Sequence, residues 1–63
     1  MGASFSAGEL RACAERELRI RKQVYPGYVL RHRMRQGKAD REINMMQAIV
    51  EILREQEKVE LLV

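Results

Sequence analysis

The side chains that could carry covalent chemistry are few, because the chain has one cysteine, one histidine and one aspartate: Cys13, His32 and Asp40. A nucleophilic site needs a base within hydrogen-bond reach of the nucleophile and a third group that orients the base. Much of the length of a predicted helix separates Cys13 from His32. A free cysteine on the inner face of a helix behaves as a small hydrophobic residue. The sequence therefore predicts no catalytic residue, and we expect the protein not to be an enzyme.

Metal and cofactor binding have equally little support in the sequence. A closed structural zinc site takes four Cys or His ligands, and this chain has one of each. A single cysteine also excludes an intrachain disulfide. The acidic residues Glu51, Glu55 and Glu57 are expected on the outward face of a helix, where water solvates them. We expect no metal site and no cofactor.

The start of the first helix is strongly encoded. Ser6 and Glu9 form the S-x-x-E pattern of a capping box, in which each side chain accepts a hydrogen bond from the other residue's backbone N–H. Phe5 and Leu10 flank the box and can form a hydrophobic staple. The pattern predicts a helix over residues 7–24. Its inner face is expected to carry Leu10, Cys13, Ala14, Leu18, Val24 and Tyr25, with Ile20 on one flank.

Pro26 is expected to end this helix, since proline has no N–H to donate and disfavours helical geometry at the preceding residue. Proline also suits the first position of a helix, so a short second helix is predicted over 26–32. A third helix follows over 36–58, and the tail at 60–63 is expected to fray. The predicted fold is all-α, a helical hairpin with a short Pro-initiated connecting helix, in one domain spanning 1–63.

The third helix carries more apolar surface than one partner helix can cover. Its inner stripe has the 4-3-4-3 spacing of an amphipathic helix and consists of Ala39, Ile43, Met46, Val50 and Leu53. A second stripe lies about a quarter-turn away and consists of Met45, Ile49, Ile52 and Val59. A chain of 63 residues has a small core and is marginally stable alone. We therefore predict a homodimer through this second stripe, with dimer against tetramer and the chain orientation left open.

Charge divides the chain into a basic part and an acidic part. Residues 11–41 carry ten Lys or Arg and three acids, a net of +7, and residues 42–63 carry two and five, a net of −3. Glu17 and Arg21 are spaced to form an ion pair at the edge of the helix interface. Basic residues concentrate around the predicted turn and at the start of the third helix, at Arg31, Arg33, Arg35, Lys38 and Arg41.

Two interpretations of this asymmetry stay open. A cluster of cations is what attraction to a nucleic-acid backbone requires. A recognition helix, however, presents basic and amide side chains from its N-terminal end, and the third helix soon turns acidic. The same asymmetry is also explained by self-association, in which a basic first helix lies beside an acidic third helix, as at the charged positions that flank a coiled-coil seam. An acidic surface on another protein is a further partner of this kind.

No window of the sequence has the roughly 18 apolar residues that a membrane span needs. The N-terminus lacks the basic and apolar regions of a secretory signal. Together with the single cysteine, these features predict a reducing, cytoplasmic location and no membrane partner.

Two blocks of sequence, Val24-Tyr25-Pro26 and Ala39-Asp40-Arg41-Glu42-Ile43, resemble a family of short proteins predicted from bacterial prophages. The resemblance extends roughly over residues 10–53. It implies an all-helical fold and a phage or prophage origin, and it implies no activity. The family commonly has Ser or Thr after a Gly-Arg/Lys-Met turn, where this chain has His32-Arg33-Met34-Arg35. The expected function is a small, non-catalytic interaction protein that acts as a homo-oligomer, with a phage or host protein as a further partner. The alternative is a nucleic-acid-binding accessory protein that uses the basic turn.

Overall fold

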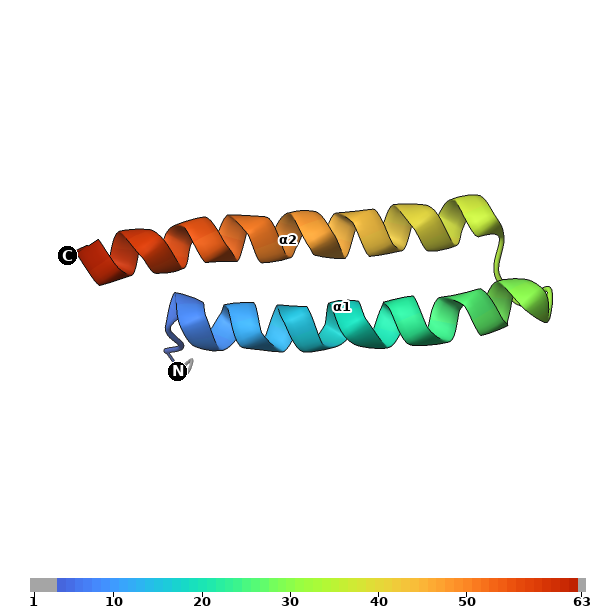
Figure 1. The fold of residues 1–63 in the computed structure, drawn as a ribbon, viewed down its shortest axis with the longest axis horizontal. Coiled ribbons are helices and arrows are strands. Elements are labelled where there is room, and N and C mark those ends of the chain that lie inside the picture. The colour runs from blue at the N-terminus through green and yellow to red at the C-terminus, as the bar shows by residue number, and fades with distance from the viewer. Residues whose placement is uncertain (1–3, 63) are drawn as a thin grey trace.

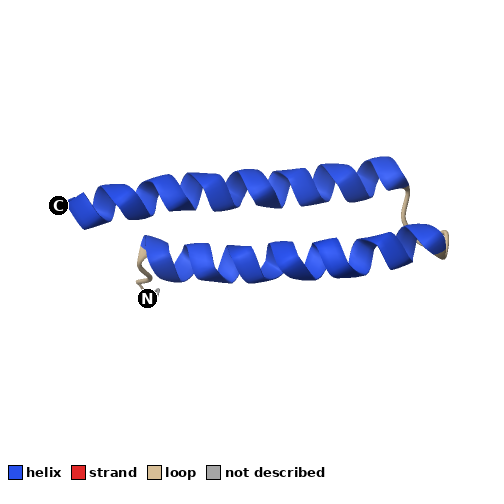
Figure 2. Cartoon of the chain, viewed as in Figure 1, coloured by secondary structure: helices blue, strands red, loops and turns tan. Residues whose placement is uncertain are grey.

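The computed structural model describes residues 4–62, which form two helices joined by a short turn. Helix α1 (Ala7–Leu30) and helix α2 (Gln36–Leu62) run antiparallel along nearly their whole length (Figure 1). The described part of the chain contains helix and loop and no strand (Figure 2). The predicted all-α helical hairpin is therefore confirmed.

The N-terminus of α1 is capped from two directions. The capping box is present, since the Ser6 Oγ accepts from the Glu9 N–H at 3.1 Å and the Glu9 Oε1 accepts from the Ser6 N–H at 3.1 Å. A second carboxylate comes from the far end of the chain, because the Ala7 N–H donates to the Glu60 Oε1 at 3.1 Å. The fraying predicted for residues 60–63 is wrong at residues 60–62, because α2 continues to Leu62 and Glu60 bonds to the positive end of α1. Residue 63 lies outside the described residues.

The predicted break at Pro26 is also wrong. Helix α1 passes through Pro26 and continues to Leu30, so no separate connecting helix exists. The φ angle of proline is compatible with a helix, and the loss is one hydrogen bond to the carbonyl of Lys22. Both Pro26 and Lys22 are exposed, so water can solvate that carbonyl. The residues after Pro26 complete the helix and supply the carbonyls that close its C-terminus.

The turn begins with a Schellman motif. The His32 N–H donates to the Val29 carbonyl at 3.0 Å, and the Arg33 N–H donates to the Tyr28 carbonyl at 2.8 Å. His32 has φ 60° and so occupies the left-handed position that usually holds glycine. The chain therefore reverses direction within residues 31–35 without a second proline or a glycine.

The two helices meet along a regular seam. On α2, Ala39 and Val50 are buried, and the partly buried Ile43, Met46 and Leu53 pack on the core cluster, which confirms the predicted inner stripe. On α1 the seam has the same 4-3-4-3 spacing but includes two arginines, in the order Ala7, Arg11, Ala14, Leu18 and Arg21.

The predicted inner face of α1 is partly wrong. Ala14 and Leu18 are buried as expected, but Leu10 and Cys13 are exposed. Ala7 is buried in their place. The helix is rotated so that its arginines, and not these two apolar residues, lie beside α2. Cys13 is consequently a surface thiol and not a core residue.

Candidate interaction surfaces

The second stripe of α2 faces solvent in the hairpin. Met45 is 42 % exposed, Ile49 43 %, Ile52 68 % and Val59 47 %. Burying apolar surface contributes about 25 cal/mol per Å², so covering the exposed part of these side chains would add stability that the hairpin alone does not have. The stripe lies where the sequence places it, outside the seam, and the structure of one chain does not cover it.

Helix α1 adds apolar surface on the same side of the hairpin. Glu15 and Arg54 form an ion pair across the seam and so mark one side of it. An α-helix advances about 100° per residue. Leu10, Cys13 and Ile20 of α1 therefore lie on the side of the seam opposite Glu15, and the second stripe of α2 lies on that same side. We call the combined surface the apolar face. Its apolar members are Leu10, Cys13, Ile20, Met45, Ile49, Ile52 and Val59, and Glu17, which pairs with Arg21, lies between Cys13 and Ile20.

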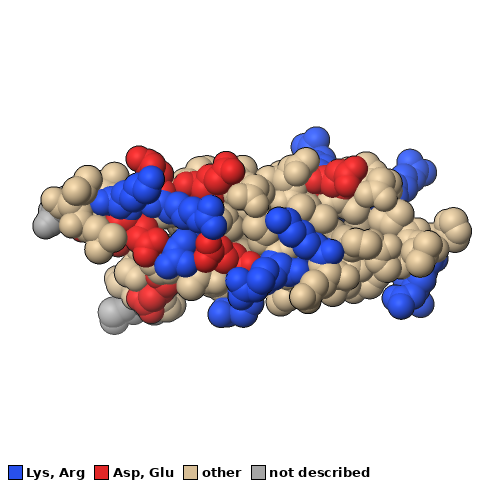
Figure 3. All heavy atoms as spheres, in the orientation of Figure 1, with Lys and Arg blue, Asp and Glu red and all other residues tan. Residues whose placement is uncertain are grey.

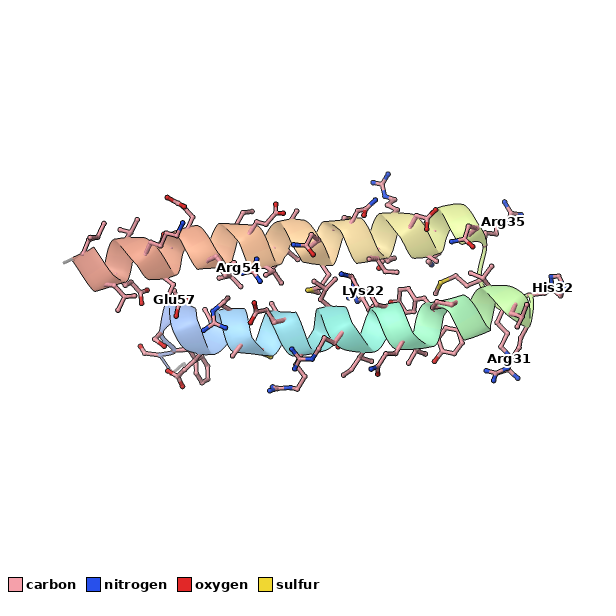
Figure 4. The ribbon with its side chains drawn as sticks, viewed as in Figure 1. Lys22, Arg31, His32, Arg35, Arg54 and Glu57 are labelled. Carbon is pink, nitrogen blue, oxygen red and sulfur yellow. The ribbon has the colours of Figure 1, made fainter. Side chains whose placement is uncertain are left out.

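The side that Glu15 marks carries a network of ion pairs near the chain termini. The Arg11 guanidinium donates to both oxygens of Glu57, at 2.7 and 3.2 Å, and to the Glu15 Oε1 at 2.6 Å. Arg54 donates to the other oxygen of Glu15 at 2.7 Å. Figure 3 shows acidic and basic side chains interleaved over this end of the molecule, and Figure 4 shows Glu57 reaching toward α1. The expectation that Glu57 lies on an outward face is wrong, because it lies at the seam and pairs with Arg11.

The network shifts the titration of its carboxyl groups. The hydrogen bond from Arg54, and then that from Arg11, lowers the pKa of Glu15 below its ordinary value of 4.5. The hydrogen bond from Arg11 lowers the pKa of Glu57 in the same direction. The same partners raise the pKa of Arg11. The ion pairs from Arg11 to Glu57 and from Arg54 to Glu15 join the two helices and fix the level at which they meet.

A second ionic contact lies at the end of the seam nearer the turn. The Arg21 Nε donates to the Glu17 Oε1 at 3.1 Å, which confirms the predicted pair at the edge of the interface. Its Nη1 donates to the backbone carbonyl of Glu42 at 2.9 Å, and the Glu42 Oε1 lies 3.9 Å away. Arginines of α1 thus pair with glutamates of α2 at both ends of the apolar core of the hairpin.

The basic cluster at the turn is arranged differently. Its five cations are exposed, and within residues 4–62 none of them makes an ion pair: Arg31, Arg33, Arg35, Lys38 and Arg41. Figure 4 shows Arg31, His32 and Arg35 extending away from the end of the hairpin. The turn also borders a shallow depression whose apolar floor comes from Val29 and Met34. The structure brings the five predicted contact residues to one end of the molecule and leaves their charges uncompensated.

Sequence reasoning missed Arg11 as a seam residue, and it placed Arg21 at the edge of the interface with Glu17 as its partner and not Glu42. The signal was available, since both continue the 4-3-4-3 spacing set by Ala7, Ala14 and Leu18. A charged residue at such a position is accommodated when an acid at the matching position of the partner helix pairs with it. The acidic residues at the matching positions are Glu57 and Glu42.

The titratable residues singled out for chemistry lie far apart. Cys13 lies near the beginning of α1, and His32 lies in the turn at its other end. Among residues 4–62, no group of three or more His, Cys, Asp or Glu side chains is placed to hold a metal ion. Neither described helix has a stretch long and apolar enough to cross a membrane.

Comparison of the chain with protein-family models, with curated proteins and with solved structures gives no match. The surfaces described above are therefore the basis on which a function can be argued.

Proposed function

We propose that this protein is a small, non-catalytic interaction protein that acts as a homodimer through the second stripe of α2. The observation that carries the proposal is an excess of accessible surface. A folded monomer of 7.4 kDa is expected to expose about 4,200 Å². This chain exposes 5180 Å². The excess of roughly 1,000 Å² is comparable with the roughly 800 Å² that each partner buries in a standard protein interface.

The shape of the hairpin supports the same proposal. Its radius of gyration is 14.5 Å, against about 10.6 Å for a compact domain of this length. A compact domain of twice the length is expected at about 13.8 Å. Two hairpins packed side by side would gain width without gaining length, and would therefore approach the dimensions of an ordinary globular domain.

The direct test is substitution on the stripe with a matched control off it. Ile52→Gln replaces an apolar side chain of the proposed interface, and Leu30→Gln replaces a leucine that is 81 % exposed at the other end of the hairpin. We expect Ile52→Gln to weaken dimerisation by about tenfold to a hundredfold, the loss expected for about 1.4–3 kcal/mol, and Leu30→Gln to leave it unchanged. Sedimentation equilibrium over a concentration series measures both dissociation constants. Equal constants for the two variants would contradict the proposed interface.

The alternative function is binding to nucleic acid through the basic turn, and the observation that favours it is the absence of ion pairs on its five cations among residues 4–62. The log of the affinity should then fall with the log of the salt concentration, with a slope near −0.9 per duplex phosphate neutralised. Arg33→Glu with Arg35→Glu should abolish binding and leave the helix content unchanged, because both side chains are exposed. We expect no gel shift at about 0.2 M salt, and a sequence-selective shift there would favour this alternative over the first function.

The origin and partners of the protein belong to the same proposal. The resemblance of the Val24-Tyr25-Pro26 and Ala39–Ile43 blocks to prophage proteins supports a phage origin, a cytoplasmic location and a phage or host protein as a further partner. Inspection of the neighbouring genes tests this origin, since phage genes should flank the reading frame.

A further inference from the structure

The two ends of the hairpin carry opposite net charge. The turn end, residues 31–41, has five cations and one acid, a net of +4. The end with the chain termini, residues 4–15 and 51–62, has three cations and six acids, a net of −3. Figure 3 shows basic side chains standing at the periphery of the turn end and acidic ones gathered toward the termini. The hairpin is therefore an electrical dipole along its long axis of 47 Å.

We infer that the occupant of the apolar face is a second copy packed head to tail, with the basic turn of each hairpin directed past the acidic end of the other. This inference rests on the proposed homodimer and adds two features to it. The interface includes Leu10, Cys13 and Ile20 of α1 as well as the stripe of α2, and the orientation of the two copies is set by charge.

Symmetry leaves two ways of stacking one apolar face on another. If the twofold axis runs along the helices, both turns lie at the same end, and α1 of each copy faces α2 of the other. If the axis crosses the helices within the interface, the turns lie at opposite ends, and α1 faces α1 while α2 faces α2. Both arrangements bury the same side chains in a four-helix bundle, so apolar burial does not choose between them.

Electrostatics makes the choice. Stacking with the turns together would place +4 beside +4 at one end and −3 beside −3 at the other. The head-to-tail arrangement keeps the two basic turns apart and directs each of them toward the acidic end of the other copy. Complementary charge at the edge of an apolar interface acts mainly by excluding the wrong arrangement, because juxtaposed like charges are costly.

The apolar residues of α1 and of α2 are centred at the same level along the long axis of the hairpin. This level predicts how the two copies are aligned along that axis. Its α1 residues run from Leu10 to Ile20, with their midpoint at Glu15, and its α2 residues run from Met45 to Val59, with their midpoint at Ile52. Glu15 hydrogen-bonds to Arg54, so the two midpoints lie at nearly the same level. The twofold axis should pass close to this level. The helix from residue 15 to residue 31 rises about 24 Å, which places the two turns about 48 Å apart.

The distance between turns distinguishes the arrangements. Arg31→Cys in a Cys13→Ala background leaves one thiol, at an exposed turn position, for a spin label. Pulsed dipolar spectroscopy of the full chain should give a distance of about 48 Å, broadened by the label, in the head-to-tail dimer. Turns at the same end would lie within about 20 Å, given helix spacings of about 8–10 Å. Dilution with unlabelled protein should remove the dipolar signal in either case.

The outcomes separate the inference from the function on which it rests. A short distance in a stable dimer would overturn the head-to-tail arrangement and leave the homodimer intact. A monomer of the wild-type chain in sedimentation equilibrium would overturn both. A distance near the expected value supports both.

Charge reversal gives an independent test, because the two arrangements predict opposite changes in dimer affinity. Lys38→Glu with Arg41→Glu reverses charge at the turn end, and glutamate near the N-terminus of α2 is compatible with the helix dipole. In the head-to-tail dimer this change should weaken association about tenfold, because it replaces attraction by repulsion. With the turns together it should strengthen association. Arg16→Glu with Arg19→Glu makes the same change in net charge at the middle of the hairpin, and it should have a smaller effect.

Discussion

Replacing His32 by glycine should stabilise the protein. His32 occupies the left-handed position of the Schellman motif, with φ 60°. That conformation costs a non-glycine residue about 1–2 kcal/mol. Glycine removes this cost, but its greater freedom in the unfolded chain offsets about 0.5–1 kcal/mol of the gain. The expected net gain is about 0.5–1 kcal/mol.

The gain is large enough to measure. A chain of this length unfolds with an entropy of about 0.13 kcal/mol per degree, so the melting temperature should rise by about 4–8 °C. Thermal unfolding followed by circular dichroism measures the shift. All samples should have the same protein concentration, because the melting temperature of a protein that dimerises depends on its concentration.

The matched control is His32→Ala, which removes the imidazole and keeps the cost of the left-handed backbone. We expect this variant to melt no higher than the wild type. If both variants melted at the wild-type temperature, or if alanine gave the same increase as glycine, the reasoning from backbone conformation would be refuted.

Three further predictions follow from the helix ends and the ion-pair network. Pro26→Ala should raise the free energy of unfolding by about 1–3 kcal/mol in urea titration, since it restores an N–H inside a continuous helix; a loss of stability would mean that proline is needed there. Glu60→Gln should lower the free energy of unfolding by about 0.3–1 kcal/mol, because it removes the carboxylate charge at the N-terminus of α1. A variant with unchanged stability would exclude this cap. Because the pKa values of Glu15 and Glu57 are lowered in the folded chain, the stability that they contribute is present above pH 4.5 and is lost as the pH falls through their lowered values. Urea titrations from pH 7 to pH 2 should show this loss, and Glu57→Gln should reduce it; an identical profile for the variant would contradict the role given to Glu57.

The parts of the fold that could be predicted from the sequence are those encoded by neighbouring residues. The capping box of Ser6 and Glu9 and the inner stripe of α2 depend on spacings of three and four residues within one helix. The pair between Glu17 and Arg21 is of the same kind. The hairpin followed because two amphipathic helices in one short chain have each other as the available partner.

The parts that could not be predicted depend on contacts between distant residues. Pro26 ends a helix by local rules, but one missing hydrogen bond at an exposed carbonyl does not stop a helix that the following turn completes. The end of α2 appears unsupported in sequence, yet Glu60 bonds to Ala7 across the hairpin. Cys13 appears to be a core residue until Arg11 is recognised as part of the seam.

The candidate surfaces also include parts that the sequence predicts and parts that depend on contacts between distant residues. The stripe of α2 and the basic turn could both be located from periodicity and charge. The position of Leu10, Cys13 and Ile20 on the same side could not be predicted, because it depends on the rotation of α1 about its own axis. The Glu15–Arg54 pair, which reveals that rotation, joins residues far apart in the chain.

The molar mass of the wild-type chain in solution tests the central claim most directly. Sedimentation equilibrium at micromolar concentration should give twice the chain mass of 7.4 kDa, because the proposed dimer covers the apolar face of each hairpin with a second copy. A helical, cooperatively folded species at the mass of a single chain would contradict the account.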